Sequence, residues 1–141
     1  MAGITLLPLT RMNWQTVLEL QLKPEQQGYM PGVLHSLAES AFEPEAEPFG
    51  LALGADVIGF ALLNHWSGPW WITRIMIDQK FQGFGYGQEA LDLLIELVRR
   101  KPGATELRTT LHKDNLTAKA VFEQAGFRPM PELQDGELVM Q

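Results

Sequence analysis

Three glycines at alternate positions are the residues of this chain whose spacing points most directly to chemistry. Gly83, Gly85 and Gly87 follow a β-prone segment that ends near Asp78, and a helical pattern begins at Gly87. Glycine lets backbone N–H groups approach a ligand without a Cβ in the way. The first turn of a helix adds unpaired N–H donors and a partial positive charge, which suit a pyrophosphate. The loop from Gln82 onward therefore predicts an anion site at a helix N-terminus, with a purely structural glycine turn as the alternative.

The residues around these glycines exclude two common phosphate-binding loops. A Walker A loop requires Gly-Lys-Ser/Thr, whereas Gly87 is followed by Gln88 and Glu89. A Rossmann fingerprint reads G-x-G-x-x-G and lies near the first strand of a βαβ unit. This loop has a different spacing and comes late, after a predicted hairpin.

Strand and helix patterns surround this loop on both sides. Strands are expected at 4–9, 49–53, 57–64, 70–78, 106–111, from 127 and at 136–140, and helices at 13–22, 31–42, 87–100 and 115–124. Asp114 is the expected N-cap of the last helix, and Gly126 is its expected C′ residue. The order is roughly β-α-α-β-β-β-α-β-α-β-β. It predicts a single α/β (α+β) domain over residues 1–141, with helices on one layer of sheet.

The overall composition limits the partners that the chain can take. Its 141 residues carry a formal charge of −6. An acidic chain lacks the basic face that phosphate backbones require, so nucleic acid is not an expected partner. No apolar stretch approaches the ~18 residues of a membrane span, and the N-terminus has no signal-peptide pattern. We therefore expect a cytoplasmic protein without a membrane partner.

Cysteine chemistry and metal binding are also not expected. The chain contains no cysteine, which removes disulfides, cysteine metal sites and a thiol nucleophile together. The three histidines show no metal-binding spacing, so no metal is expected.

Two separate stretches together resemble the GCN5-related N-acetyltransferase (GNAT) superfamily. The phosphate loop of that family, Q/R-x-x-G-x-G/A, is matched by Gln82, Gly85 and Gly87. Its second signature is matched by Asn115, Ala118, Phe122, Glu123, Gly126 and Phe127. The resemblance is strong over about residues 49–141 and implies a mixed, mostly antiparallel sheet. Residues 22–27, 36–39, 74–78 and 135–137 further resemble the spermine/spermidine acetyltransferase branch.

The resemblance implies acetyl-coenzyme A as a co-substrate and suggests its contacts. The backbone of Ile75, Met76 and Ile77 would pair with the pantetheine arm like an added strand. A backbone N–H near Met76 would stabilise the thioester oxygen as charge develops on it. The pyrophosphate would be held by N–H groups of Gln82, Gly83, Phe84, Gly85, Tyr86, Gly87 and Gln88. Asn115 would reach the cofactor and Lys119 would lie near its phosphate or adenine side, although Asn115 suits a helix start equally well.

Phe122 departs from the pattern of the family. It is expected at the cofactor, in the slot where many members carry a tyrosine that protonates the departing thiolate. The chain contains two tyrosines, Tyr29 and Tyr86, and Tyr86 is expected to face away from the reaction. A thiol has a pKa near 8.5, so a thiolate is a tolerable leaving group at neutral pH. General acid catalysis contributes ~10²–10⁴-fold to the rate, not the whole of it. The absence of the tyrosine therefore predicts a slower enzyme or a substitute proton donor. Water and Tyr29 are the substitutes considered.

Three residues are candidates for the general base that deprotonates the attacking ammonium. His65 and His112 belong to a residue type that titrates near neutrality, and Glu39 lies on a helix that walls the acceptor site in this family. For each of them an exposed surface position is the structural alternative.

These observations predict an acetyl-CoA-dependent N-acetyltransferase in which a small amine attacks the thioester directly. A polyamine acceptor would meet acidic side chains at Glu39, Glu43, Glu45, Glu47, Asp135 and Glu137. The alternatives are a catalytically weak acyl-CoA-binding or sensing domain, which Phe122 favours, and a protein N-terminal acetyltransferase. Family resemblance favours a homodimer, with Trp66, Trp70 and Trp71 in its interface or in the core.

Overall fold

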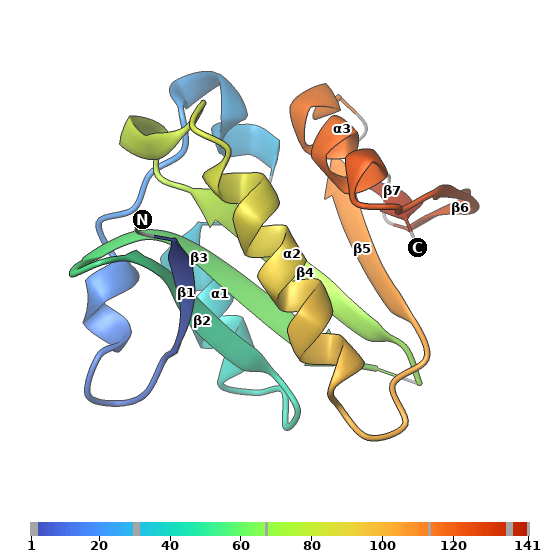
Figure 1. Cartoon of the computed structure of the whole chain (residues 1–141), viewed down its shortest axis with the longest axis horizontal. Coiled ribbons are helices and arrows are strands. Elements are labelled where there is room, and N and C mark those ends of the chain that lie inside the picture. Colours follow the sequence, from blue (N-terminus) through green and yellow to red (C-terminus); the bar gives the residue numbers. More distant parts are fainter. Residues whose placement is uncertain (1–2, 30–31, 67, 113, 135–136, 141) are drawn as a thin grey trace.

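A seven-stranded sheet runs through the chain in the computed structural model, which describes residues 3–29, 32–66, 68–112, 114–134 and 137–140. The strands are β1 (Ile4–Pro8), β2 (Glu47–Leu53), β3 (Asp56–His65), β4 (Trp70–Ile77), β5 (Leu107–His112), β6 (Pro129–Gln134) and β7 (Glu137–Met140). Their order across the sheet is β1-β2-β3-β4-β5-β7-β6, and only β4 and β5 pair in parallel (Figure 1). The predicted α/β class with a mixed, mostly antiparallel sheet is therefore confirmed.

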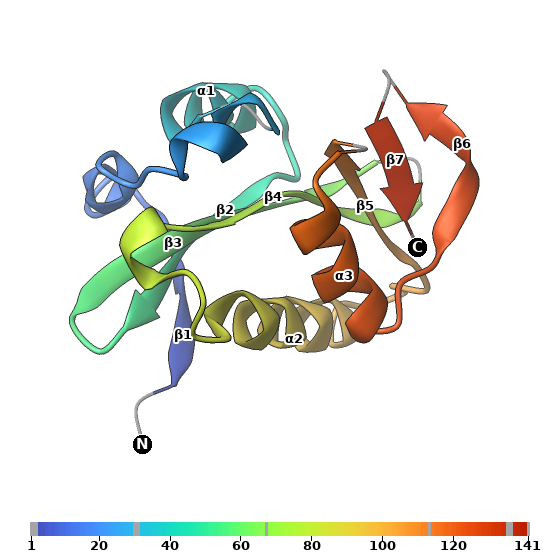
Figure 2. The same ribbon diagram turned by 90° about the horizontal axis from the view of Figure 1, so that it is seen from above.

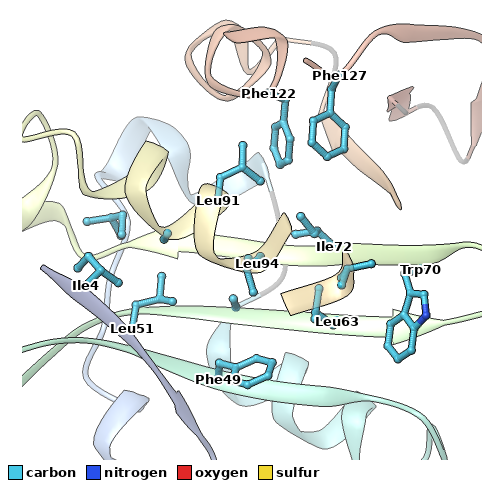
Figure 3. Close-up of a cluster of buried hydrophobic side chains, with 14 of the residues drawn as sticks. Ile4, Phe49, Leu51, Leu63, Trp70, Ile72, Leu91, Leu94, Phe122 and Phe127 are labelled. Atoms are coloured by element: carbon cyan, nitrogen blue, oxygen red, sulfur yellow. The ribbon is translucent and has the colours of Figure 1, made fainter. Parts of the chain in front are cut away.

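One face of the sheet is covered by the long helix α2 (Tyr86–Arg99), with α3 (Leu116–Gln124) beside it (Figure 2). The spacing of Ala90, Leu91, Leu94 and Val98 places them on one side of α2, and all four are buried. Figure 3 shows Leu94 pointing toward sheet residues such as Leu63, and Leu91 pointing toward Phe122 on α3. These side chains belong to the larger of two hydrophobic clusters. It packs α2 against the sheet and so positions the glycine loop at the N-terminus of that helix.

The opposite face carries shorter elements. They are the helix α1 (Val33–Ser40) and the 3₁₀ helices η1 (Trp14–Val17) and η2 (Pro24–Tyr29), as Figure 2 shows for α1. Their cluster is smaller and consists of Val17, Val33, Phe60, Leu62 and Met76. The two faces of the sheet are therefore packed by elements of very different regularity.

The helix predicted over residues 13–22 is wrong. Only the 3₁₀ helix η1 forms there, so the first predicted α in the element order is not an α-helix. The reason is incomplete burial: Val17 is fully buried, but Trp14 and Leu18 remain 37% and 40% exposed. An apolar stripe that cannot be covered does not stabilise a longer helix. The other predicted elements are present, with ends shifted by a residue or two.

β4 and β5 pair over only three positions and then separate. Their register ends at Ile72 opposite Thr109, whereas β4 continues to Ile77 and β5 to His112. The pairing of β4 with β3 passes from Ile72 to Arg74, which leaves Thr73 as a bulge at this point. Bulges bend a strand, and Figure 1 shows the two strands diverging beyond it.

None of the helices in the described ranges is long and apolar enough to cross a membrane.

Candidate active site

Two threonine hydroxyl groups form hydrogen bonds at the point where β4 and β5 separate. The Thr109 hydroxyl is buried and donates to the Ile72 carbonyl at 2.8 Å. The Thr73 hydroxyl donates to the Leu62 carbonyl at 3.1 Å and accepts from the Asn64 amide at 2.9 Å. These hydroxyls donate to backbone carbonyls at the place where regular strand pairing is interrupted. They were not identified from the sequence, because a bulge has no local sequence signal here.

A cavity of about 620 Å³ lies between the diverging strands. Its volume falls in the range of small-molecule sites. It is lined by residues from β4, β5, the start of α2, α3 and the segment before α1. The sequence-predicted residues among them are Ile75, Met76, Ile77, Gln82, Gly83, Gly85, Tyr86, Gly87, Gln88, His112, Asn115 and Phe122.

The β4 wall of the cavity is suited to an extended ligand. Ile75, Met76 and Ile77 pair with β3 on one side, but in the described register they have no partner on β5. An extended chain in the cavity can therefore bond to this edge as an added strand would. Their side chains also pack in the hydrophobic clusters on the two faces of the sheet.

The glycine loop leads into the start of α2 with its backbone exposed to the cavity. Gly83 and Gly85 have φ angles of +88° and +83°, a region that L side chains rarely adopt. A Cβ added at either position would meet no atom within 4 Å, so the space in front of the loop is open. Gly85 is also the N-cap of α2 and has no side chain to bond the first-turn N–H groups. The loop therefore fits a pyrophosphate, which would accept those hydrogen bonds.

Asn115 combines a structural position with a position at the cavity. It is the N-cap of α3, and its Oδ1 accepts from the backbone N–H of Ala118 at 3.3 Å. The expected cap, Asp114, is therefore wrong by one residue. Since the cap uses only the side-chain oxygen and Asn115 also lines the cavity, both roles considered for it from the sequence are compatible with the structure.

Phe122 forms part of the cavity wall at the position where the family often has tyrosine. It is 3% exposed, and its ring meets that of Phe127 edge-on at 5.1 Å between centroids. Tyr86, which was expected to face away from the reaction, also lines the cavity. The side chain of Tyr29 is not among those that the structure describes.

Among the three candidate bases, His112 is the one that lines the cavity. Its Nδ1 accepts from the backbone N–H of Asp114 at 3.1 Å. Glu39 does not line the cavity and pairs with Arg74, with 2.9 Å between Oε1 and Nη2. His65 stacks on Trp70 at 4.6 Å, at the end of β4 remote from Ile77.

The acidic side chains expected to receive a polyamine bind groups elsewhere. Glu43 accepts from the Trp66 indole at 3.0 Å, Glu45 meets His65 at 3.3 Å, and Glu47 pairs with Lys101 at 2.7 Å. None of these three lines the cavity. Asp135 and the side chain of Glu137 lie outside the described part of the chain.

Two predicted cofactor residues do not line the cavity itself. Phe84 is 68% exposed on the glycine loop, and its ring lies 5.9 Å from that of Tyr86. Lys119 is half-buried on α3. Conversely, the cavity wall includes Leu22, Lys23 and Gln26, which were noticed in the sequence only as part of the stretch 22–27.

Metal-binding side chains do not gather in the described part of the chain. No group of three or more His, Asp or Glu residues there has the arrangement of a metal site.

Several known proteins similar to this chain are acetyltransferases. Residues 14–127 match the profile of the Acetyltransferase (GNAT) family. A spermine/spermidine N(1)-acetyltransferase from Bacillus subtilis (strain 168) is 25% identical, over 98% of this chain and 97% of the relative. A GNAT acetyltransferase from Elizabethkingia anophelis with acetyl-CoA bound has 18% identity and a TM-score of 0.70, covering 98% of this chain and 96% of the other. The aminoglycoside acetyltransferase AAC(6')-Ib in complex with paromomycin and acetyl-CoA has 19% identity and a TM-score of 0.78, covering 98% and 92%.

Proposed function

Because the chain belongs to the acetyltransferase (GNAT) family, we propose that it transfers an acetyl group from acetyl-CoA to a small amine in the cavity between β4 and β5. The N-acetyltransferase class predicted from the sequence is confirmed by that membership. One observation carries the proposal. The same cavity reaches from an open glycine loop at a helix N-terminus to a strand edge without a partner on β5.

Each part of this cavity has a proposed role toward acetyl-CoA. The N–H groups of the loop from Gln82 to Gln88 hold the pyrophosphate, and the free edge of Ile75–Ile77 bonds the pantetheine arm. A backbone N–H near Met76 donates to the carbonyl oxygen of the thioester as negative charge develops there. Asn115, at the start of α3, and Lys119 contact the nucleotide part.

The reaction is a direct transfer from sulfur to nitrogen. The amine nitrogen attacks the thioester carbonyl, so that a C–N bond forms, the C–S bond breaks, and the sulfur leaves as thiolate. The amine must lose a proton, and we propose His112 as the acceptor because it is the candidate base at the cavity. To take that proton, Nδ1 of His112 must release the hydrogen bond that it accepts from the Asp114 N–H. Glu39 remains the second candidate, although its pairing with Arg74 competes with that role.

We propose a polyamine as the first acceptor class to be tested. The support is the relative from Bacillus subtilis, a spermine/spermidine N(1)-acetyltransferase whose alignment covers nearly the whole chain. The described acidic residues do not support it, since Glu43, Glu45 and Glu47 bind donors elsewhere. An aminoglycoside is a second class, suggested by the structural neighbour with paromomycin.

An assay for released thiol tests the proposal. Purified protein is mixed with acetyl-CoA and one of spermidine, spermine, an aminoglycoside, an amino acid or a short peptide. We expect thiol release that depends on the amine and exceeds hydrolysis without amine. Binding of acetyl-CoA without thiol release from any amine would contradict the transfer and favour the acyl-CoA-binding alternative. Acetylation of peptide N-termini alone would favour the protein N-terminal acetyltransferase.

Phe122→Tyr tests the missing general acid. A tyrosine here restores a proton donor at the cavity wall, and general acid catalysis contributes ~10²–10⁴-fold. A large rise in turnover would show that the natural protein lacks this donor. Phe127→Tyr is the control, because Phe127 is buried to a similar degree and does not line the cavity.

We propose that residues 1–141 act as one domain, in the cytoplasm, as a homodimer and without nucleic-acid or membrane partners. The sheet that joins β1 to β7 supports one domain, and the formal charge of −6 supports the absence of a nucleic-acid partner. Light scattering coupled to size exclusion measures the oligomeric state, and a monomer at micromolar concentration would contradict the dimer.

A further inference from the structure

The segment before α1 forms a wall of the cavity, but the proposed reaction gives it no role. Leu22, Lys23 and Gln26 from this segment line the cavity together with the glycine loop. The two regions are more than fifty residues apart in the sequence. The hydrogen bonds that join them therefore show how the two walls of the cavity are held relative to each other.

Gln26 and Gln82 bond to each other through both of their side-chain amides. Gln82 Nε2 donates to Gln26 Oε1 at 3.0 Å, and Gln26 Nε2 donates to Gln82 Oε1 at 3.2 Å. Gln26 Oε1 also accepts from the backbone N–H of Lys23 at 3.2 Å. The reciprocal pair thus joins the first residue of the glycine loop to the segment before α1, which also lines the cavity.

The Gln82 side chain has no N–H left for a phosphate. A primary amide has two N–H donors. Gln82 Nε2 uses one toward Gln26 Oε1 and the other toward the carbonyl of Ile77 at 2.9 Å. The side chain therefore links the loop to the end of β4 and to Gln26, and only the backbone of this residue can serve the pyrophosphate.

A second connection joins the same two regions near the end of β4. The buried carboxylate of Asp78 accepts from the backbone N–H of Gln21 at 2.8 Å and from that of Lys80 at 3.2 Å. The backbone N–H of Gln79 donates to the Gln21 carbonyl at 2.7 Å. Gln21 and Gln26 are thus both anchored, and the cavity-lining residues Leu22 and Lys23 lie between them.

We propose that Gln26 is a positioning residue that couples the glycine loop to the cavity wall at residues 21–27. When a pyrophosphate orders the loop that begins at Gln82, the amide pair transmits this order to the wall at residues 21–27. This inference rests on the proposed function, because it requires coenzyme A to bind at the glycine loop.

The size of the effect follows from the bonds involved. A neutral hydrogen bond contributes modestly to stability, so loss of the pair should raise the Kd for coenzyme A about three- to tenfold. The change in ordering is the more specific expectation. Without the amide of Gln26, binding of coenzyme A can still order the glycine loop, but it no longer orders the backbone of residues 21–27.

Hydrogen exchange with coenzyme A as the probe measures this coupling without knowledge of the acceptor. In the natural protein, coenzyme A should slow exchange both in the loop at 83–88 and in the wall at 21–27. In Gln26→Ala it should still slow exchange in the loop but not in the wall. Calorimetry on the same samples gives the Kd for coenzyme A.

Two further variants separate positioning from folding. Gln27→Ala is the matched control, because the Gln27 amide is exposed and donates to the Leu22 carbonyl at 3.4 Å rather than to the loop; it should behave as the natural protein. Gln26→Glu keeps the size of the side chain and can accept from Gln82 Nε2 but cannot donate to Gln82 Oε1. It should show an intermediate loss of protection, and it serves as the test if Gln26→Ala does not fold.

The outcomes that overturn the inference are distinct from failure of the proposed function. Protection of the loop without protection of the wall in the natural protein would refute the coupling and leave cofactor binding intact. Unchanged protection of the wall in Gln26→Ala would assign the pair a purely structural role. No binding of coenzyme A at all would overturn both proposals.

Discussion

The two faces of the sheet are built in different ways. On one face, the 14-residue helix α2 begins at the open glycine loop and packs four buried side chains against the strands. On the other face, α1 has 8 residues and is accompanied by two 3₁₀ helices. That face is joined to the rest of the site by side-chain hydrogen bonds such as Gln26–Gln82 and Arg74–Glu39. The comparison indicates that the α2 face is stabilised mainly by its larger hydrophobic cluster, whereas the α1 face combines a smaller cluster with specific polar contacts.

The largest expected effect compares adjacent leucines on β3. Leu62 and Leu63 are both fully buried, but Leu62 belongs to the smaller cluster under α1 and Leu63 to the larger cluster under α2. Leucine-to-alanine changes in cores cost about 2–5 kcal/mol, depending on how far the site can collapse. We expect Leu63→Ala near the upper end and Leu62→Ala near the lower end, measured by urea unfolding. Equal losses would contradict the difference between the faces.

The second prediction concerns the glycine loop on the α2 side. Gly85→Val places a β-branched residue at a positive φ angle in front of the helix N-terminus, which costs about 1–3 kcal/mol of strain. It should weaken coenzyme A binding about 10- to 100-fold in calorimetry, because the N–H groups no longer point at the ligand.

Gly54→Val is the control for that change. Gly54 also has a positive φ, of +62°, with open space around it, but it lies in the turn between β2 and β3. It should lower stability to a similar extent and leave binding unchanged. Equal loss of binding in the two variants would mean that general strain, and not the loop, is responsible.

The third prediction concerns the point where β4 and β5 separate. Thr109→Val keeps the shape of the side chain but removes the donor to the buried Ile72 carbonyl, which should cost about 1–3 kcal/mol in urea unfolding. Thr16→Val is the comparison, because the Thr16 hydroxyl donates to the Asn13 carbonyl at an exposed site, and its effect should stay within about 0.5 kcal/mol. If Thr109→Val loses no more unfolding free energy than Thr16→Val, the Thr109 hydroxyl does not stabilise the point where β4 and β5 separate.

The smallest expected effect concerns the ion pair on the α1 side. Glu39→Gln removes the charge that pairs with Arg74, and such partly exposed pairs contribute about 0–1 kcal/mol. The loss of stability should shrink as salt is added. Glu96→Gln, on the exposed side of α2, provides the control, since its pair with Arg99 is 3.8 Å long. If Glu39→Gln lowers turnover strongly while stability changes only by this small amount, Glu39 and not His112 would be the general base.

Local patterns allowed much of the fold to be predicted. The apolar stripe of α2 and the continuous apolar runs of β2 and β3 are local patterns, and those elements form where they were expected. The stretch 13–22 was misread because its spacing is helical, whereas Trp14 and Leu18 find too little covering surface. Asp114 and Asn115 are both good capping residues, and only the path of the chain between β5 and α3 selects Asn115.

What the sequence by itself determined is the glycine loop, the helix after it and the signature from Asn115 to Phe127, because each depends on residues close together in the chain. Tertiary structure alone decided that Thr73 bulges, that Glu39 pairs with Arg74, and that His112 rather than His65 lies at the cavity. It also brought Gln26 to Gln82. These contacts join distant segments through strand register and helix placement, and no spacing within one segment encodes them.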